Sequence, residues 1–172
     1  MTLPDTESSA REHAEESVMN ALNTNIVTQV ALVVRDIEAV KHKWAALLGV
    51  AVPPTREPGE YSVTGTTYRG RPAPEAGCLL AFFDISPTTQ LEIIQPNGET
   101  SAWQDFLDQH GEGVHHLAFH VTDTDARLDA VKAEFGWETV QRGKYGDGSG
   151  EYGYVDSAGD LKVMLETLES YH

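Results

Sequence analysis

Four polar residues interrupt apolar, strand-like segments of the 172-residue chain: Gln29 in "VTQVALVV", Glu92 in "QLEIIQP", His116 in "HHLAFHV" and Glu166 in "VMLETLE". A buried polar side chain on such a strand needs a partner, and buried carboxylates need a counter-charge. One imidazole nitrogen and three oxygens, with water completing five or six positions, suit Zn²⁺, Ni²⁺, Co²⁺ or Mn²⁺. These four residues are therefore candidate ligands of a divalent metal ion.

Each of these residues also has an ordinary explanation. A histidine on a half-buried strand is often a hydrogen-bonded structural residue, and a glutamate between apolar neighbours can lie on the solvent face of its strand. We expect the second arrangement for Glu169. The metal hypothesis depends on the position of the four residues within an internal repeat.

The repeat joins a strand and a helix in each half of the chain. "NIVTQVALVVRD" predicts a strand, and "DIEAVKHKWAALLG" predicts a helix between Asp36 and Gly49. "HHLAFHVTD" predicts a second strand, and "DTDARLDAVKAEFG" predicts a helix between Asp123 and Gly136. The two segments align without a gap at an offset of 87 residues.

This offset pairs Gln29 with His116, while Glu92 and Glu166 occupy the last strand-like run of each half. Further strands are predicted at "CLLAFFDI", "QLEIIQP", "EYGYVDS" and "LKVMLETLE", and "SAWQDFLDQH" predicts a linking helix. The sequence thus predicts an α+β fold of two paired β-α-β-β-β modules, about 25–98 and about 112–170. An acidic tail or short helix, residues 1–24, precedes them.

The long loop "PPTREPGEYSVTGTTYRGRPAPEAG" contains possible strands between Tyr61 and Tyr68. It can be a plain surface connection, but loops of this length inside compact domains are often functional. We take Tyr68 and Arg69 as candidate substrate contacts.

Two adjacent histidines begin the second repeat. Neighbouring residues on a regular strand point to opposite faces, so only one of them can face the metal. We expect His116 to face it, and His115 to point the other way with Leu117 and Phe119. Loss of His116 should then abolish metal binding, and loss of His115 should weaken it much less.

Charge and composition exclude several classes of partner. A formal net charge of −15 and a pI near 4.7 disfavour nucleic acid and anionic membrane surfaces. There is no apolar run of about 18 residues, and the acidic start lacks the features of a signal peptide, so we expect a cytoplasmic protein. The single cysteine, Cys78 within "CLLAFF", excludes an intramolecular disulfide and predicts a buried structural thiol.

These segments resemble the vicinal oxygen chelate superfamily from about Asn25 to Ser170. "GEGVHHLAFHV" closely resembles the corresponding segment of methylmalonyl-CoA epimerases, and "LEIIQP" is similar to their metal-binding strand. The resemblance implies a curved mixed sheet around a metal cleft. It also implies a divalent metal cofactor, a small carbonyl or acyl-thioester substrate and a homodimer. The ligands that it implies are Gln29, Glu92, His116 and Glu166.

The chemistry implied by the resemblance is removal of a proton beside a carbonyl group. Glu166 is the first candidate for the base, and Glu92 is its counterpart in the other half. Two bases on opposite sides of one carbon would suit inversion. The leading hypothesis is a metal-dependent isomerase or epimerase that acts on a carbonyl compound or an acyl thioester.

Two alternatives stay open. The Gln, Glu, His, Glu set resembles zinc-type glyoxalase I, although Val33 and Pro96 stand where that enzyme has glutathione-binding arginine and asparagine residues. A lyase that uses another thiol is therefore one alternative. A non-catalytic small-molecule binding or resistance protein is the other. The single metal-facing histidine disfavours an extradiol dioxygenase, which needs two.

Overall fold

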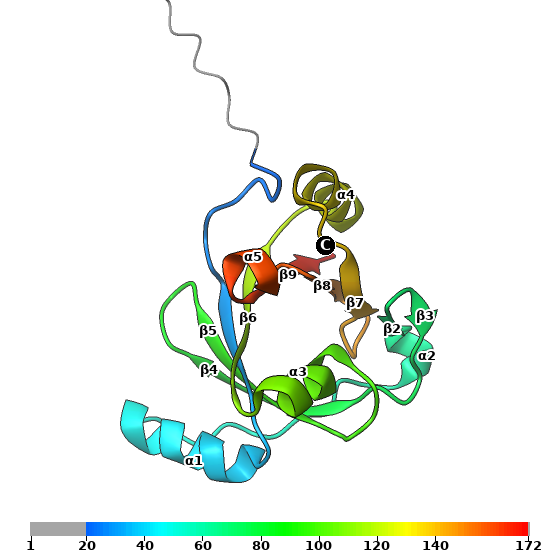
Figure 1. Ribbon diagram of the computed structural model, residues 1–172. Coiled ribbons are helices and arrows are strands. Elements are labelled where there is room, and N and C mark those ends of the chain that lie inside the picture. The colour runs from blue at the N-terminus through cyan, green and yellow to red at the C-terminus, as the bar shows by residue number, and fades with distance from the viewer. Residues whose placement is uncertain (1–19, 172) are drawn as a thin grey trace, which may run out of the picture.

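One curved sheet organises the part of the chain that the computed structural model describes, residues 20–171 (Figure 1). The predicted tail falls mostly on residues outside this range. The nine strands follow the order β3-β2-β7-β8-β9-β6-β1-β5-β4. The elements are β1 (Gln29–Val33), α1 (Ile37–Leu48), α2 (Tyr61–Thr64), β2 (Thr67–Tyr68), β3 (Arg71–Pro72), β4 (Cys78–Asp84), β5 (Gln90–Pro96), α3 (Ala102–His110), β6 (Gly113–His120), α4 (Thr124–Phe135), β7 (Thr139–Lys144), β8 (Gly150–Val155), α5 (Ala158–Leu161) and β9 (Met164–Ser170).

The two modules meet at the centre of the sheet, where their first strands pair. β1 is antiparallel to β6, and each of these strands is parallel to the last strand of its own module, β5 or β9. The repeat predicted from the sequence is confirmed by this near-symmetric arrangement.

The predicted helix boundaries are also confirmed. The Asp36 carboxylate accepts a hydrogen bond from the Ala39 backbone N–H at 2.9 Å, which caps the start of α1, and Gly49 ends the helix at φ 68°. Asp123 and Gly136 do the same for α4. No helix within residues 20–171 is long and apolar enough to cross a membrane.

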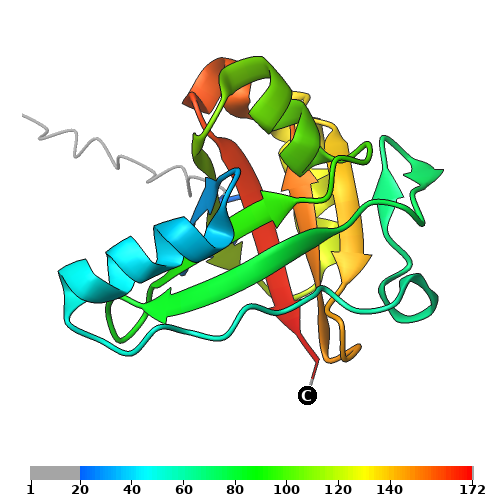
Figure 2. The same ribbon diagram turned by 90° about the horizontal axis from the view of Figure 1, so that it is seen from below.

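Three helices cover different parts of the sheet (Figures 1 and 2). α1 packs on the outer face of β4 and β5, where Ile37 and Ala45 meet Ile93. α4 covers the outer face of β8 and β9 in the same way. α3 instead closes the concave side at one end. Its apolar residues are buried there with side chains of four strands; this cluster comprises Ala31, Val33, Cys78, Ile94, Ala102, Trp103, Leu107 and Tyr154.

The first module departs from the predicted pattern in its long loop. The strand expected before β4 is reduced to one bridge, between Arg56 and Leu80. The predicted strand between Tyr61 and Tyr68 is wrong over its first half, which forms the short helix α2 and ends at Gly65 with φ 53°. β2 and β3 form a hairpin that pairs with β7 of the second module.

Glu169 does not simply face solvent, because its carboxylate caps α4. Its two oxygens accept from the backbone N–H groups of Asp123 and Thr124 at 2.9 and 2.8 Å. These hydrogen bonds lower the pKa of Glu169, so they stabilise the fold above the unfolded-state pKa and are lost as pH falls through the lower folded-state value.

We expect Glu169→Gln to lower the free energy of unfolding by about 1 kcal/mol at pH 7, because a charge-assisted cap becomes neutral. The difference from the wild type should shrink as the pH falls below 4. Urea titrations at both pH values check this, with Glu134→Gln on the exposed face of α4 as the matched control. A pH-independent loss would contradict the capping role.

Candidate metal centre

Four adjacent strands at the centre of the sheet each carry one of the predicted ligands. Glu166 lies on β9, His116 on β6, Gln29 on β1 and Glu92 on β5, which is their spatial order. The strand register places all four side chains on the concave face. The four residues predicted from the sequence are thus brought together by the fold.

Two alanines leave room for these side chains to converge. Ala31 is the cross-strand partner of both His116 and Glu92, and Ala118 is the partner of both Gln29 and Glu166. Cross-strand partners share one face of a sheet. Both alanines are fully buried. Polar and small side chains therefore alternate across the centre of the sheet, and the alternation follows the repeat.

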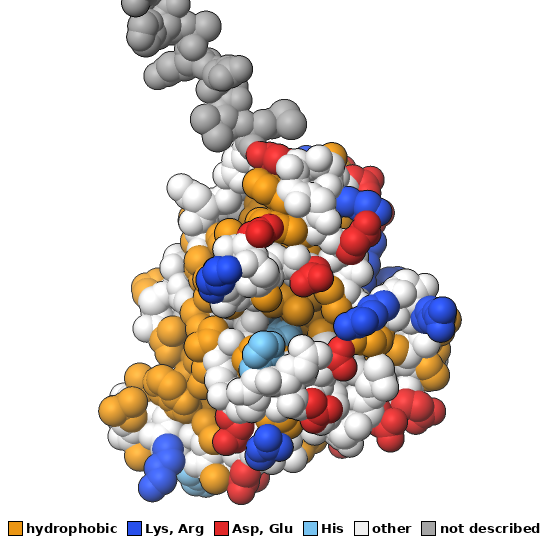
Figure 3. Space-filling model, in the orientation of Figure 1, with side chains coloured by type: hydrophobic (Ala, Val, Ile, Leu, Met, Phe, Trp, Pro, Cys, Tyr) orange, Lys and Arg blue, Asp and Glu red, His pale blue; other side chains and the backbone are white. Residues whose placement is uncertain are grey.

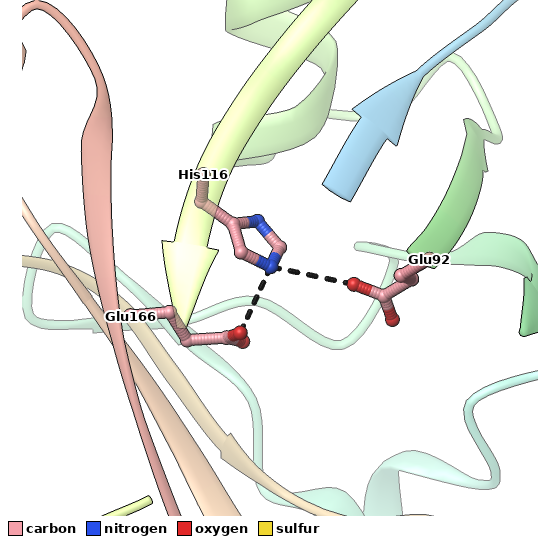
Figure 4. A group of neighbouring side chains, drawn as sticks. All are labelled: Glu92, His116 and Glu166. Carbon is pink, nitrogen blue, oxygen red and sulfur yellow. Dashed lines mark ion pairs between the residues drawn. The ribbon is translucent and has the colours of Figure 1, made fainter. Parts of the chain in front are cut away.

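The polar atoms of Glu92, His116 and Glu166 lie close together on the concave face (Figure 4). His116 Nε2 is 2.8 Å from a Glu166 oxygen and 3.4 Å from a Glu92 oxygen. The Gln29 carboxamide lies 3.2 Å from the same nitrogen. With its oxygen and nitrogen exchanged, this amide would donate to both carboxylates. One ligand atom from each of Glu92, His116 and Glu166 falls within 4.8 Å of the others.

Burial and mutual charge shift the pKa values of these groups. Burial alone would lower the pKa of His116, but the two carboxylates outweigh it and raise the pKa to about 9. Burial raises the pKa of Glu92, the contact with His116 partly offsets this rise, and the charge of Glu166 adds to it. Burial and the charge of His116 lower the pKa of His115 well below its usual range. The Ala102 backbone opposes this shift but does not outweigh it.

This donor set fits a divalent ion. Glu92, His116 and Glu166 are at most 7% exposed, so two carboxylates are buried against one imidazole. The only ion pairs that these carboxylates make within residues 20–171 are with His116. A divalent cation would compensate this excess negative charge, and the nitrogen and oxygen donors match the preferences of Zn²⁺, Ni²⁺, Co²⁺ and Mn²⁺.

The adjacent histidine does not point away as expected. The β1–β6 register shifts here, because Ala31 is opposite His116 while Leu32 is opposite Val114. His115 is therefore the extra residue of a β-bulge, which breaks the alternation of side chains. Its ring contacts that of His116, with the centroids 5.1 Å apart, and the two Nδ1 atoms are 2.9 Å apart.

The carboxylates open onto a cavity of about 580 Å³ on the concave side. One wall is apolar and aromatic and includes Phe82, Trp103 and Tyr152. The rim contains charged residues that the sequence analysis missed, among them Arg56, Glu57, Lys144 and Asp147. They lie on a loop of the first module and at or just after the end of β7 in the second, and only the fold brings them together.

Glycines hold two of these loops in close contact at the rim. A Cβ atom on Gly146 would lie 2.3 Å from the carbonyl oxygen of Pro58, and one on Gly59, at φ 100°, would lie 2.6 Å from the Gly146 Cα. Such distances are far below van der Waals contact, so glycine is required at both positions. This contact closes one side of the cavity.

Tyr68 and Arg69 are not among the residues that line this cavity. Both contact Asp105 on α3, and Arg69 lines a separate hollow of about 1080 Å³ beside α3 and α5. Figure 3 shows this hollow as an apolar depression with charged side chains around it. Trp103 faces the carboxylate cavity and Phe106 faces the hollow, so α3 separates the two. A substrate role for Tyr68 and Arg69 stays a prediction.

Metal binding should depend on pH through His116. Its imidazole is protonated below pH 9 in the free protein, and a metal ion requires the neutral ring. Apparent affinity for Mn²⁺ should therefore rise by about tenfold per pH unit between pH 6 and 8. Calorimetry at pH 7 in two buffers of different protonation enthalpy should show release of at least one proton per ion. Binding without proton release, or undiminished binding in His116→Ala, would contradict this assignment.

Among curated proteins, the chain is similar to an ethylmalonyl-CoA/methylmalonyl-CoA epimerase of Cereibacter sphaeroides. The two are 27% identical over 107 residues, which is 62% of this chain and 68% of the relative. Among solved structures, it is similar to a methylmalonyl-CoA epimerase of Mycobacterium tuberculosis, with 19% identity, a TM-score of 0.60 and coverage of 85% and 88% of the two chains.

A variant of the Streptomyces coelicolor methylmalonyl-CoA epimerase, solved with 2-nitronate-propionyl-CoA, is similar at 19% identity and a TM-score of 0.61, covering 85% of this chain and 97% of that one. These structural likenesses support the predicted fold. The family model that describes the glyoxalase/bleomycin resistance protein/dioxygenase superfamily matches residues 28–154. The chain is therefore a member of that superfamily, the vicinal oxygen chelate superfamily.

Proposed function

We propose that the protein is a metal-dependent epimerase. It inverts the configuration of a carbon atom that lies beside a carbonyl group and carries an acidic hydrogen. The substrate class that we propose is an acyl thioester that carries a carboxylate group on the same carbon. The observation that carries the proposal is the cluster of Glu92, His116 and Glu166 on adjacent strands, with ligand atoms within 4.8 Å of one another and facing a cavity.

In this proposal Gln29, Glu92, His116 and Glu166 hold the divalent ion. The ion, when bound, would act as a Lewis acid that polarises a carbonyl oxygen of the substrate. His116 supplies the only nitrogen donor and must be deprotonated at Nε2. Gln29 presents its carboxamide oxygen, and the two glutamates present one oxygen each.

Glu166 is the proposed base. A carboxylate oxygen of Glu166 takes the proton from the substrate α-carbon, and the electron pair of the C–H bond moves toward the carbonyl oxygen. The same proton, or one from a second acid, is then returned to the carbon. Burial at 3% exposure keeps water from competing for this proton.

Inversion requires proton delivery to the face opposite the one that lost the proton. Glu92 comes from β5 and Glu166 from β9, on opposite flanks of β1 and β6. Burial raises the pKa of Glu92 more than the contact with His116 lowers it, which favours proton uptake by this carboxylate. We propose that Glu166 is the base and Glu92 the acid when one epimer is converted to the other. The two residues exchange these roles in the reverse reaction.

The epimerase names of the similar proteins support this reaction class. One similar structure contains a propionyl-CoA derivative, which supports a thioester substrate. The cavity is compatible with such a substrate, because it combines an aromatic wall with two cations, Arg56 and Lys144, that can pair with anionic groups although Glu57 and Asp147 share the rim.

The proposed reaction predicts exchange of substrate hydrogen with solvent. The metal-loaded protein in D₂O should incorporate deuterium at the α-carbon of a 2-alkylmalonyl-CoA, and Glu166→Gln should lower this rate by at least about 100-fold. Proton NMR or mass spectrometry of the recovered substrate measures it.

Glu169→Gln, three residues farther along β9, is the matched control and should exchange at the wild-type rate. Exchange that persists after chelation of the metal would contradict the proposal. Stoichiometric metal without exchange on any acyl thioester would favour the lyase alternative. A folded protein that binds small molecules without metal would favour the binding protein.

A further inference from the structure

The second histidine of the pair makes a contact that the proposed chemistry does not yet use. His115 Nδ1 lies 2.9 Å from His116 Nδ1, and His115 is only 1% exposed. The other nitrogen of His116, Nε2, faces the carboxylates. His115 therefore lies directly behind the nitrogen donor of the candidate metal centre.

The hydrogen bond between the two rings has one consistent direction. It needs one N–H and one lone pair, because both atoms are imidazole nitrogens. A neutral His116 that gives its Nε2 lone pair to a metal ion carries its proton on Nδ1. His115 Nδ1 must then accept, which leaves the single proton of a neutral His115 on its own Nε2.

The same direction holds without metal. When His116 is protonated on both nitrogens, it donates from Nε2 toward the glutamates and from Nδ1 toward His115. His115 therefore serves as an acceptor in both conditions, and nothing in its ring has to change when a metal ion enters or leaves.

The surrounding residues fix the His115 ring in place. The bulge brings it beside His116 rather than to the opposite face. Phe106 of α3 and Tyr154 of β8 each meet it edge-on, with ring centroids 5.2 and 5.3 Å away and interplanar angles of 87° and 86°. Tyr154 is itself held by a hydrogen bond from Trp103 Nε1 at 3.0 Å.

This arrangement has a cost. His115 Nε2 is buried and makes no hydrogen bond of normal geometry within residues 20–171, although the Ala102 backbone lies near enough to the ring to oppose the fall in its pKa. A buried polar group without a partner typically costs about 1–3 kcal/mol. An apolar ring at this position would avoid that cost and keep the packing, so stability of the core does not explain a histidine here.

We propose that His115 is a positioning residue that accepts the Nδ1 proton of His116 and thereby fixes the orientation and tautomer with which His116 presents Nε2 to the metal. The inference rests on the proposed metal site and adds to it a residue that touches neither metal nor substrate. Hydrogen-bond partners of this kind typically change metal affinity by about 10–100-fold when they are removed.

Two substitutions separate the hydrogen bond from the packing. His115→Phe keeps an aromatic ring but has no acceptor, whereas His115→Asn loses the ring but places a carbonyl oxygen near the position of Nδ1. Phe106→Leu is the packing control, because it alters the contact with His115 and leaves the hydrogen bond. The melting temperature of each metal-free variant shows whether it folds.

We expect Co²⁺ to bind His115→Phe about 10–100-fold more weakly than the wild type, and to bind His115→Asn and Phe106→Leu within a few-fold of it. The visible absorption spectrum of bound Co²⁺ should change in His115→Phe and not in His115→Asn. ¹⁵N NMR of the Zn²⁺-loaded wild type should show His116 protonated at Nδ1.

Wild-type affinity and spectrum in a folded His115→Phe would overturn the proposal and leave the metal site intact. Equal losses in the Phe and Asn variants, matched by Phe106→Leu, would also overturn it, because packing would then explain the effect. A wild type that binds neither Co²⁺ nor Zn²⁺ would overturn the proposed function and this inference together.

Discussion

Two carboxylates buried against a single imidazole set the central constraint on this structure. Moving charged groups out of water costs several kcal/mol per ion, and only close opposite charge can offset that cost. His116 supplies one positive charge to two glutamates, so one negative charge remains uncompensated. The protein can balance it with a divalent ion or with a proton, and the burial that raises the pKa of Glu92 favours proton uptake there.

The sheet meets this constraint by placing the charged groups on its most rigid part. The four ligand positions lie on interior strands, each hydrogen-bonded on both sides, and α1, α3 and α4 pack against the sheet around them. Sites on such elements hold their geometry better than sites on loops. Ala31 and Ala118 provide the space, and a larger residue at either position would fill the volume in which the polar atoms meet.

The sequence predicted the features that depend on local pattern and internal repetition. Helix ends at Asp36, Gly49, Asp123 and Gly136 follow from capping chemistry, and the alignment of Gln29 with His116 follows from the repeat. It did not predict features that depend on pairing between distant segments. The bulge at His115 is a property of the β1–β6 register and leaves no local signature. The cavity rim likewise forms from loops that meet only after the sheet has curved.

The hairpin of β2 and β3 has a consequence for association between chains. It pairs with Gln141 and Arg142 in the middle of β7, and β3 has only two residues, one of them Pro72, which has no N–H to donate. Exposed edge strands are templates for aggregation, and short strands with proline are a common protection. β4 is then the long edge strand among residues 20–171, bridged only at Leu80. A second chain that extends this sheet by strand addition would find its longest free edge at β4, at the opposite end of the sheet from the hairpin.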